Sequence, residues 1–168
     1  MDKKDLDKKL KNDIFSANTQ VALSALNIIK ERGNKSYLPI LFDLLLSFPE
    51  KELEKEIKNV LGTIKQKDSV PVFVEALKKN KYKPIRKTIL TACWQNGLDF
   101  KEHLLIFAEL VIEEDWETGF EAFTVIENLK ELPDKEIIEK TITKINDSIE
   151  TIGDKKKYFL QEILFKIS

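Results

Sequence analysis

Two short apolar segments, each with a proline near its start, recur along this chain at a fixed spacing. They cover 36–45 and 67–77, and their prolines, Pro39 and Pro71, lie 32 residues apart. The same spacing beyond Pro71 reaches His103, near the start of a third apolar segment. A proline fits the first turn of a helix, because the amide that it lacks would have no intrahelical partner there. Internal similarity at this period predicts a stack of repeated helical units.

Longer amphipathic helices are predicted before these short segments. Over 51–67 the apolar residues recur at the spacing of one helix face, namely Leu53, Ile57, Val60, Leu61 and Ile64. Over 17–32 the same pattern predicts four core-facing residues, Val21, Ala25, Ile28 and Ile29. A later row of isoleucines predicts the apolar face of another helix, formed by Ile138, Ile142, Ile145, Ile149 and Ile152.

The remaining segments extend the same arrangement. We expect helix pairs at 83–96 with 99–113 and at 116–131 with 134–152, and flanking helices at about 2–12 and 155–167. No stretch alternates polar and apolar residues for long enough to form a strand. The predicted fold is therefore all-α, with four helix pairs plus flanking helices in one domain over 1–168.

Residues that start and stop helices occur between these elements. The predicted N-caps are Ser36, Asp68, Asp99 and Asp134, whose side-chain oxygens can accept hydrogen bonds from free amides of the first turn. The predicted helix ends are Gly33 and Gly97, because glycine tolerates the left-handed conformation found there.

A long helix, a short turn and a shorter apolar helix with an early proline together resemble the HEAT-repeat family and its armadillo-like relatives. The resemblance rests on 36–39, 68–71 and the caps Asp99 and Asp134, and it extends over almost the whole chain. It implies a right-handed α-α superhelix whose inner surface binds partners, typically proteins. By the same resemblance the shorter helices line the concave side, where outward-facing residues are candidate contacts: Asp43, Glu75, Glu109 and Lys140.

The charge of the chain bears on nucleic-acid binding. The sequence has 28 Lys and Arg against 29 Asp and Glu, a formal net charge of −1, so the basic surface typical of nucleic-acid-binding proteins is not indicated. One local basic run stands out, formed by Lys78, Lys79, Lys81, Lys83, Arg86 and Lys87 together with Tyr82. It is interpreted either as a phosphate contact with Tyr82 stacking on a base or, preferred here because the overall charge is balanced, as a solvated loop between repeats.

An acidic patch has two interpretations as well. It consists of Glu109, Glu113, Glu114, Asp115, Glu117 and Glu121. These residues surround a turn between two predicted helices. They either receive a basic partner peptide or favour the dipole at a helix start, as Asp115 and Glu117 would.

Few residues suggest catalysis or metal binding. The five glycines form no phosphate-binding loop, and one His and one Cys cannot assemble a zinc site. Cys93 is predicted to be buried, and His103 is either a base in a groove or, preferably, part of a packed helix. We therefore expect no catalytic residue, no cofactor, no metal and no membrane span, and a cytoplasmic location.

These observations favour a non-enzymatic scaffold that binds another protein or peptide. The alternative is nucleic-acid binding, or an activity like that of the DNA glycosylases built from HEAT-like repeats. For that activity Trp94, Trp116 and Asp115 qualify by residue type alone. The sequence leaves open whether Trp94, Trp116 and His103 are buried packing or part of a site. A third possibility is a structural piece of a larger assembly, marked by an exposed apolar patch on a terminal helix.

Overall fold

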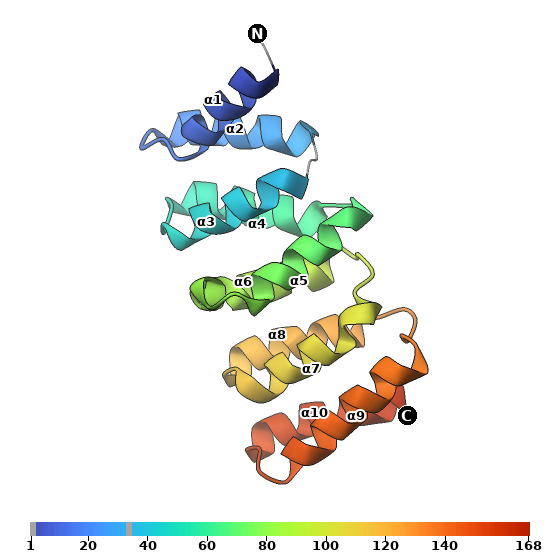
Figure 1. Ribbon diagram of the computed structural model, residues 1–168. Helices are drawn as coiled ribbons and strands as arrows, with labels where there is room; N and C mark the ends of the chain where they lie inside the picture. The colour runs from blue at the N-terminus through green and yellow to red at the C-terminus, as the bar shows by residue number, and fades with distance from the viewer. Residues whose placement is uncertain (1–2, 33–34) are drawn as a thin grey trace. The chain divides into compact units, whose positions relative to one another are not determined.

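The computed structural model describes residues 3–32 and 35–168, and within these ranges the chain is helical with no β-strand. The helices are α1 (Lys3–Ile14), α2 (Thr19–Arg32), α3 (Leu38–Leu46), α4 (Lys51–Thr63), α5 (Val70–Lys78), α6 (Arg86–Gln95), α7 (Leu104–Glu113), α8 (Trp116–Glu127), α9 (Lys135–Ile149) and α10 (Asp154–Ile167) (Figure 1). Short 3₁₀ helices lie between them: η1 (Lys35–Tyr37), η2 (Lys67–Ser69), η3 (Asn80–Ile85) and η4 (Lys101–His103). The all-α prediction is confirmed. The predicted pairing of the helices is wrong, because the consecutive helices that pack against each other are α1–α2, α3–α4, α7–α8 and α9–α10.

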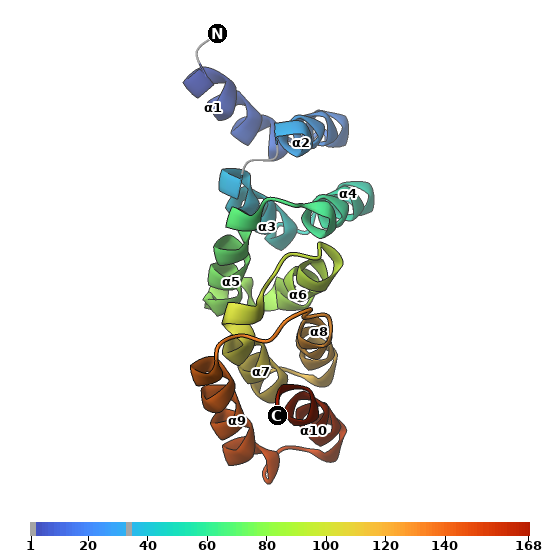
Figure 2. The same ribbon diagram turned by 90° about the vertical axis from the view of Figure 1, so that its right-hand side faces the viewer.

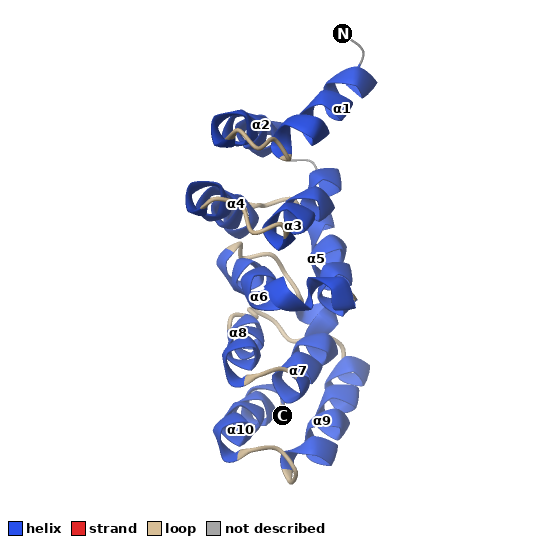
Figure 3. Ribbon diagram, turned by 90° about the vertical axis from the view of Figure 1, so that its left-hand side faces the viewer, coloured by secondary structure: helices blue, strands red, loops and turns tan. Residues whose placement is uncertain are grey.

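The chain forms two compact units, Met1–Ile85 and Arg86–Ser168. Within the first unit, α3 and α5 lie on one side and α2 and α4 on the other (Figure 2). Within the second unit, α7 and α9 share one side, and α6, α8 and α10 share the other (Figure 3). Each unit therefore has two rows of helices, and in the first unit the shorter helices α3 and α5 form one of them. The single domain over 1–168 stays a prediction.

The core of the first unit confirms the stripe on α4 and corrects the one on α2. Leu53, Ile57, Val60 and Leu61 are buried, whereas Ile64, the fifth predicted residue, follows the end of α4 and is half-buried. On α2 the buried residues are Ala22, Ala25, Leu26 and Ile29. Val21 and Ile28, predicted to face the core, are 37% and 39% exposed. They lie at the edge of the stripe, where small changes in the rotation of a helix decide which residues are covered.

The core of the second unit is closed by α10, which packs against α7, α8 and α9. Its buried residues are Phe159, Leu160, Ile163 and Ile167. The isoleucine row marks the less exposed face of α9, where Ile145 is buried and Ile138, Ile142 and Ile149 are half-buried. Ile152, the fifth predicted residue, is half-buried but follows the end of the helix. Gly119 permits α8 to approach α7, since a Cβ there would meet the carbonyl oxygen of Val111 at 3.3 Å.

The starts of the short helices differ from the sequence prediction. Pro39 and Pro71 lie in the first turn of α3 and α5, as predicted. The predicted caps Ser36 and Asp68 are wrong, because a 3₁₀ turn precedes each helix and the N-cap positions belong to Tyr37 and Ser69. Neither N-cap side chain bonds a free amide.

The predicted caps before α7 and α9 have different outcomes. Asp99 accepts a hydrogen bond from the amide of Lys101 at 3.0 Å, so it holds the 3₁₀ turn before α7 and does not cap the helix itself. His103 occupies the N-cap position of α7, so the residue equivalent to Pro71 is Leu105. Asp134 is the N-cap residue of α9 without a side-chain bond.

The predicted helix ends have separate outcomes. Gly97 follows α6 with φ 69°, the left-handed conformation expected of it. Gly33 lies outside the described residues.

The Ser69 side chain offers a test of this packing. Ser69 is fully buried, and its Oγ has no hydrogen-bond partner within the described residues. A buried hydroxyl without a partner has lost its bonds to water. We therefore expect Ser69→Ala to raise the free energy of unfolding by up to about 1 kcal/mol, measured by urea denaturation.

Ser47→Ala is the matched control. The Oγ of Ser47 donates to the carbonyl oxygen of Leu44 at 2.6 Å, so the same change there should lower the free energy of unfolding by about 0.5–1.5 kcal/mol. Equal losses in both variants would contradict the description of Ser69.

Candidate functional site

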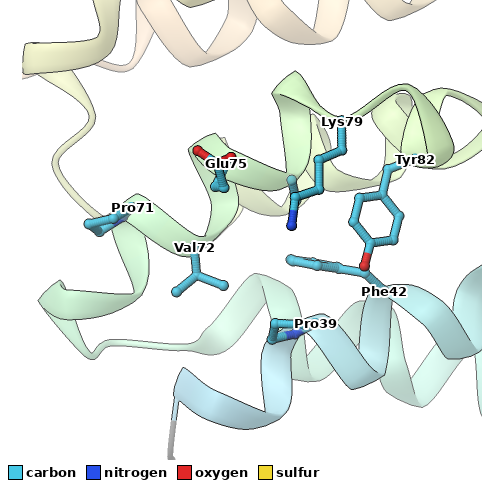
Figure 4. Close-up of a pocket in the computed structure, with 8 residues that line it drawn as sticks. Pro39, Phe42, Pro71, Val72, Glu75, Lys79 and Tyr82 are labelled. Atoms are coloured by element: carbon cyan, nitrogen blue, oxygen red, sulfur yellow. The ribbon is translucent and has the colours of Figure 1, made fainter.

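An apolar hollow of about 360 Å³ opens between α3 and α5 in the first unit (Figure 4). It is lined by Pro39, Phe42, Pro71, Val72, Glu75, Ala76, Lys79 and Tyr82. The two repeat prolines are exposed, and each sits in the first turn of its helix. The repeat pattern therefore places equivalent residues of successive short helices at this hollow.

The floor of the hollow is held by the Tyr82 side chain. The rings of Phe42 and Tyr82 meet edge to face, with centroids 5.7 Å apart. The Tyr82 hydroxyl donates to Asp43 Oδ1 at 2.8 Å, and the Lys81 ammonium donates to the same oxygen at 3.0 Å. Burial raises the pKa of Tyr82, and the bond to Asp43 raises it further, so the phenol stays a neutral donor. These contacts hold the floor in place before a partner binds, and they already use the hydrogen-bonding groups of Tyr82 and Lys81.

Two charged side chains flank the hollow on the α5 side (Figure 4). Glu75 and Lys79 are both exposed, and within the described part of the chain neither has an ion-pair partner. Glu75 lies within α5, and Lys79 is the residue that follows its last turn. The Lys79 side chain extends toward the hollow (Figure 4). An apolar surface bounded by opposite charges can hold an apolar side chain and orient the groups next to it.

Comparison with protein families matches residues 8–94 to the HEAT repeats. This match extends over more than half of the chain and includes every residue that lines the hollow. The chain belongs to the HEAT-repeat family. No curated protein matches the chain.

Half of the predicted contact residues of this HEAT-repeat protein meet at the hollow. Glu75, Lys79 and Tyr82 line it, while Asp43 and Lys81 brace its floor. The sequence had placed these five in two groups, the concave contacts and the basic run. The apolar lining was missed as a site. The signal for it in the sequence is the pair of repeated prolines, Pro39 and Pro71, from which only helix starts are predicted.

The other predicted contact residues lie elsewhere. Lys83 is exposed on η3 and does not line the hollow. Glu109 is half-buried on α7, and Lys140 is exposed on α9, where it pairs with Glu136 at 2.6 Å. The role of these three residues in binding stays a prediction.

In the second unit, the end of the basic run pairs with the acidic patch. Nη1 of Arg86, which is 9% exposed, lies 2.5 Å from Glu114 Oε1. The Lys87 ammonium lies 2.5 Å from Glu117 Oε2. Glu121 Oε2 accepts hydrogen bonds from Thr91 and Trp94. These charges join α6 to α8 and its preceding turn. The interpretation of the whole basic run as a solvated loop is therefore wrong at Arg86 and Lys87, which belong to α6, and at Tyr82, which is buried.

The tryptophans differ in their surroundings. Trp94 is half-buried, and its indole nitrogen donates to Glu121 at 2.7 Å. Trp116 is 46% exposed and stacks on Phe120 with ring centroids 5.6 Å apart. A second hollow, of about 460 Å³, is lined by Trp116, Lys155, Tyr158 and Phe159. Trp94 therefore belongs to packing, whereas Trp116 is at an open surface.

Asp115 has a structural role at the start of α8. Its carboxylate accepts a hydrogen bond from the amide of Thr118 at 2.8 Å. That bond holds the pKa of Asp115 below its usual range, because it stabilises the charged form. The assignment of Asp115 to a helix start is confirmed.

Cys93 is 1% exposed, and burial raises the pKa of its thiol, so it is protonated within the core. His103 is half-buried at the start of α7. In residues 3–32 and 35–168 no group of three or more acidic, His or Cys side chains could hold a metal ion. None of the described helices is long and apolar enough to cross a bilayer.

The Arg86–Glu114 pair leads to a prediction about stability. Arg86→Met leaves the Glu114 carboxylate buried without its partner, and we expect a loss of about 3–5 kcal/mol in the free energy of unfolding, measured by urea denaturation. The double variant Arg86→Met/Glu114→Leu should recover most of this loss, because no charge is then left unpaired.

An exposed pair provides the control. Lys58 pairs with Glu54 on the surface of α4, so Lys58→Met should change stability by less than about 1 kcal/mol. If Arg86→Met lowered the free energy of unfolding as little as Lys58→Met does, the Arg86–Glu114 pair would not be needed for stability.

Proposed function

We propose that this HEAT-repeat protein is a non-enzymatic scaffold that binds a segment of another protein in the hollow between α3 and α5. The observation that carries the proposal is a preorganised apolar hollow on the side of α3 and α5. At its edge lie Glu75 and Lys79, which have no ion-pair partner in the part of the chain that the structure describes. HEAT repeats generally act as protein-interaction scaffolds. The hollow provides a specific place for such an interaction in this chain.

The size of the hollow favours one anchoring side chain of a longer partner over a small-molecule ligand. Its volume is near the lower end of the range of about 300–1,000 Å³ for ligand pockets. Burial of one Leu, Ile or Val contributes about 1.5–3 kcal/mol. A micromolar complex needs about 8 kcal/mol. Contacts of the partner beyond the hollow are therefore part of the proposal.

The nucleic-acid alternative has less support. Lys81, Arg86 and Lys87 of the basic run each pair with a carboxylate of the same chain. Binding to phosphate would have to compete with these pairs. The absence of catalysis and the cytoplasmic location remain predictions.

Selection from a displayed library of random peptides tests the proposal. We expect recovered peptides to bind the unmodified protein and to lose at least about tenfold in affinity to Val72→Lys, because an ammonium in the apolar hollow must be desolvated. Affinities can be measured by fluorescence anisotropy with labelled peptides.

Val21→Lys is the control, since it makes the same change at an exposed valine on α2 of the same unit. It should leave binding unchanged. Circular dichroism should show that both variants keep their helix content. Peptides that bind Val72→Lys as tightly as the unmodified protein would contradict the proposal.

Binding to duplex DNA distinguishes the alternative. We expect no measurable binding at low salt, because the paired lysines and arginine cannot release counterions from the duplex without breaking their own contacts. A gel-shift or anisotropy measurement with a random duplex checks this. Tight binding that weakens steeply with added salt would favour the nucleic-acid function.

A further inference from the structure

We infer that the segment bound between α3 and α5 carries an apolar anchor next to two opposite charges, an acidic residue that meets Lys79 and a basic residue that meets Glu75. This inference rests on the proposed function of the hollow and specifies the chemistry of its partner.

Of the four charged side chains that the structure describes around the hollow, two form an ion pair with each other and two do not. Asp43 and Lys81 are engaged with each other at 3.0 Å, and Asp43 also accepts the Tyr82 hydroxyl. The Lys81 ammonium lies 4.6 Å from the centroid of the Tyr82 ring, a further contact within the same cluster. These groups are satisfied by the fold. Glu75 and Lys79, in contrast, are exposed and have no ion-pair partner within the described residues.

The floor determines the chemistry of the anchor. Phe42, Val72 and Ala76 offer carbon atoms, and the one hydroxyl of the lining, on Tyr82, is used by Asp43. A polar side chain placed there would lose its hydrogen bonds to water without replacement. The anchor is therefore an aliphatic side chain or proline.

The separation of the two free charges sets their spacing in the partner. Glu75 and Lys79 are four residues apart, which corresponds to about 6 Å along a helix axis. An extended chain advances about 3.3 Å per residue. A segment that runs along α5 therefore presents its acidic and basic residues about two positions apart. The order of the two charges reports the direction of the segment relative to α5.

The two charged side chains at the rim of the hollow, Glu75 and Lys79, affect the selectivity of binding more than its affinity. Exposed ion pairs each change an equilibrium by only about two- to fivefold, and salt screens them. The apolar anchor supplies most of the binding, whereas the charges determine which segments fit and in which direction. The contribution of the rim should therefore fall as salt is added, while that of the anchor should remain.

The test compares peptide selections on two proteins, the unmodified chain and the double charge reversal Glu75→Lys/Lys79→Glu. The reversal keeps the net charge and changes two exposed residues only. We expect the unmodified protein to enrich peptides with an aliphatic anchor and an acidic and a basic residue about two positions apart. These peptides should lose at least about fivefold in affinity to the reversed protein, and synthetic peptides with the two charges exchanged should recover it.

The matched control is Glu52→Lys/Lys55→Glu, which exchanges two exposed charges on α4, on the other side of the first unit. It should leave the selected peptides and their affinities unchanged.

The possible results separate the inference from the proposed function. If selected peptides depend on Val72 but bind the reversed protein equally well, the charge pattern is wrong and the hollow remains the binding site. If no selected peptide depends on Val72, the proposed function fails and the inference fails with it. If the reversed protein prefers peptides in which the acidic and basic residues are exchanged, the result supports both the inference and the proposed function.

Discussion

The burial of apolar helix faces against neighbouring repeats is the constraint on which this structure depends. The short helices α3 and α5 are apolar on most of their surface, and each buries five residues. One helix pair cannot cover that surface alone, so successive pairs must pack in line. The edge-to-face contacts of Phe42 with Phe73 and Tyr82, each with centroids 5.7 Å apart, join α3 to α5 and η3 in the first unit.

Polar contacts fix the register of this packing. In the first unit, Asp7 accepts the Tyr37 hydroxyl at 2.6 Å and pairs with Arg32 at 3.3 Å. Asp43 accepts the Tyr82 hydroxyl and pairs with Lys81 in the same way. Each carboxylate thus receives a phenol and a cation from a later part of the repeat array. These charged groups therefore serve the fold of the first unit.

A HEAT-repeat fold identifies no partner by itself, because one fold hosts many functions. The local chemistry narrows the choice for this chain. The repeated prolines stand at the edge of the hollow, the aromatic rings form its floor, and Glu75 and Lys79 supply opposite charges at its rim. In the proposed function these groups bind an extended protein segment, and a few side chains on a scaffold built by packing give the specificity.

The sequence by itself determined which segments are helical, where Pro39 and Pro71 start the short helices, and that helix pairs repeat, because helix formation depends on residues within a few positions of each other. The sequence wrongly predicted that Val21 and Ile28 face the core, since periodicity identifies an apolar stripe on a helix but not the neighbouring element that covers it. Only the tertiary structure decided which charges are paired. Asp43 and Tyr82 are 39 residues apart, and their contact depends on how α3 packs against η3, as the hollow depends on how α3 packs against α5.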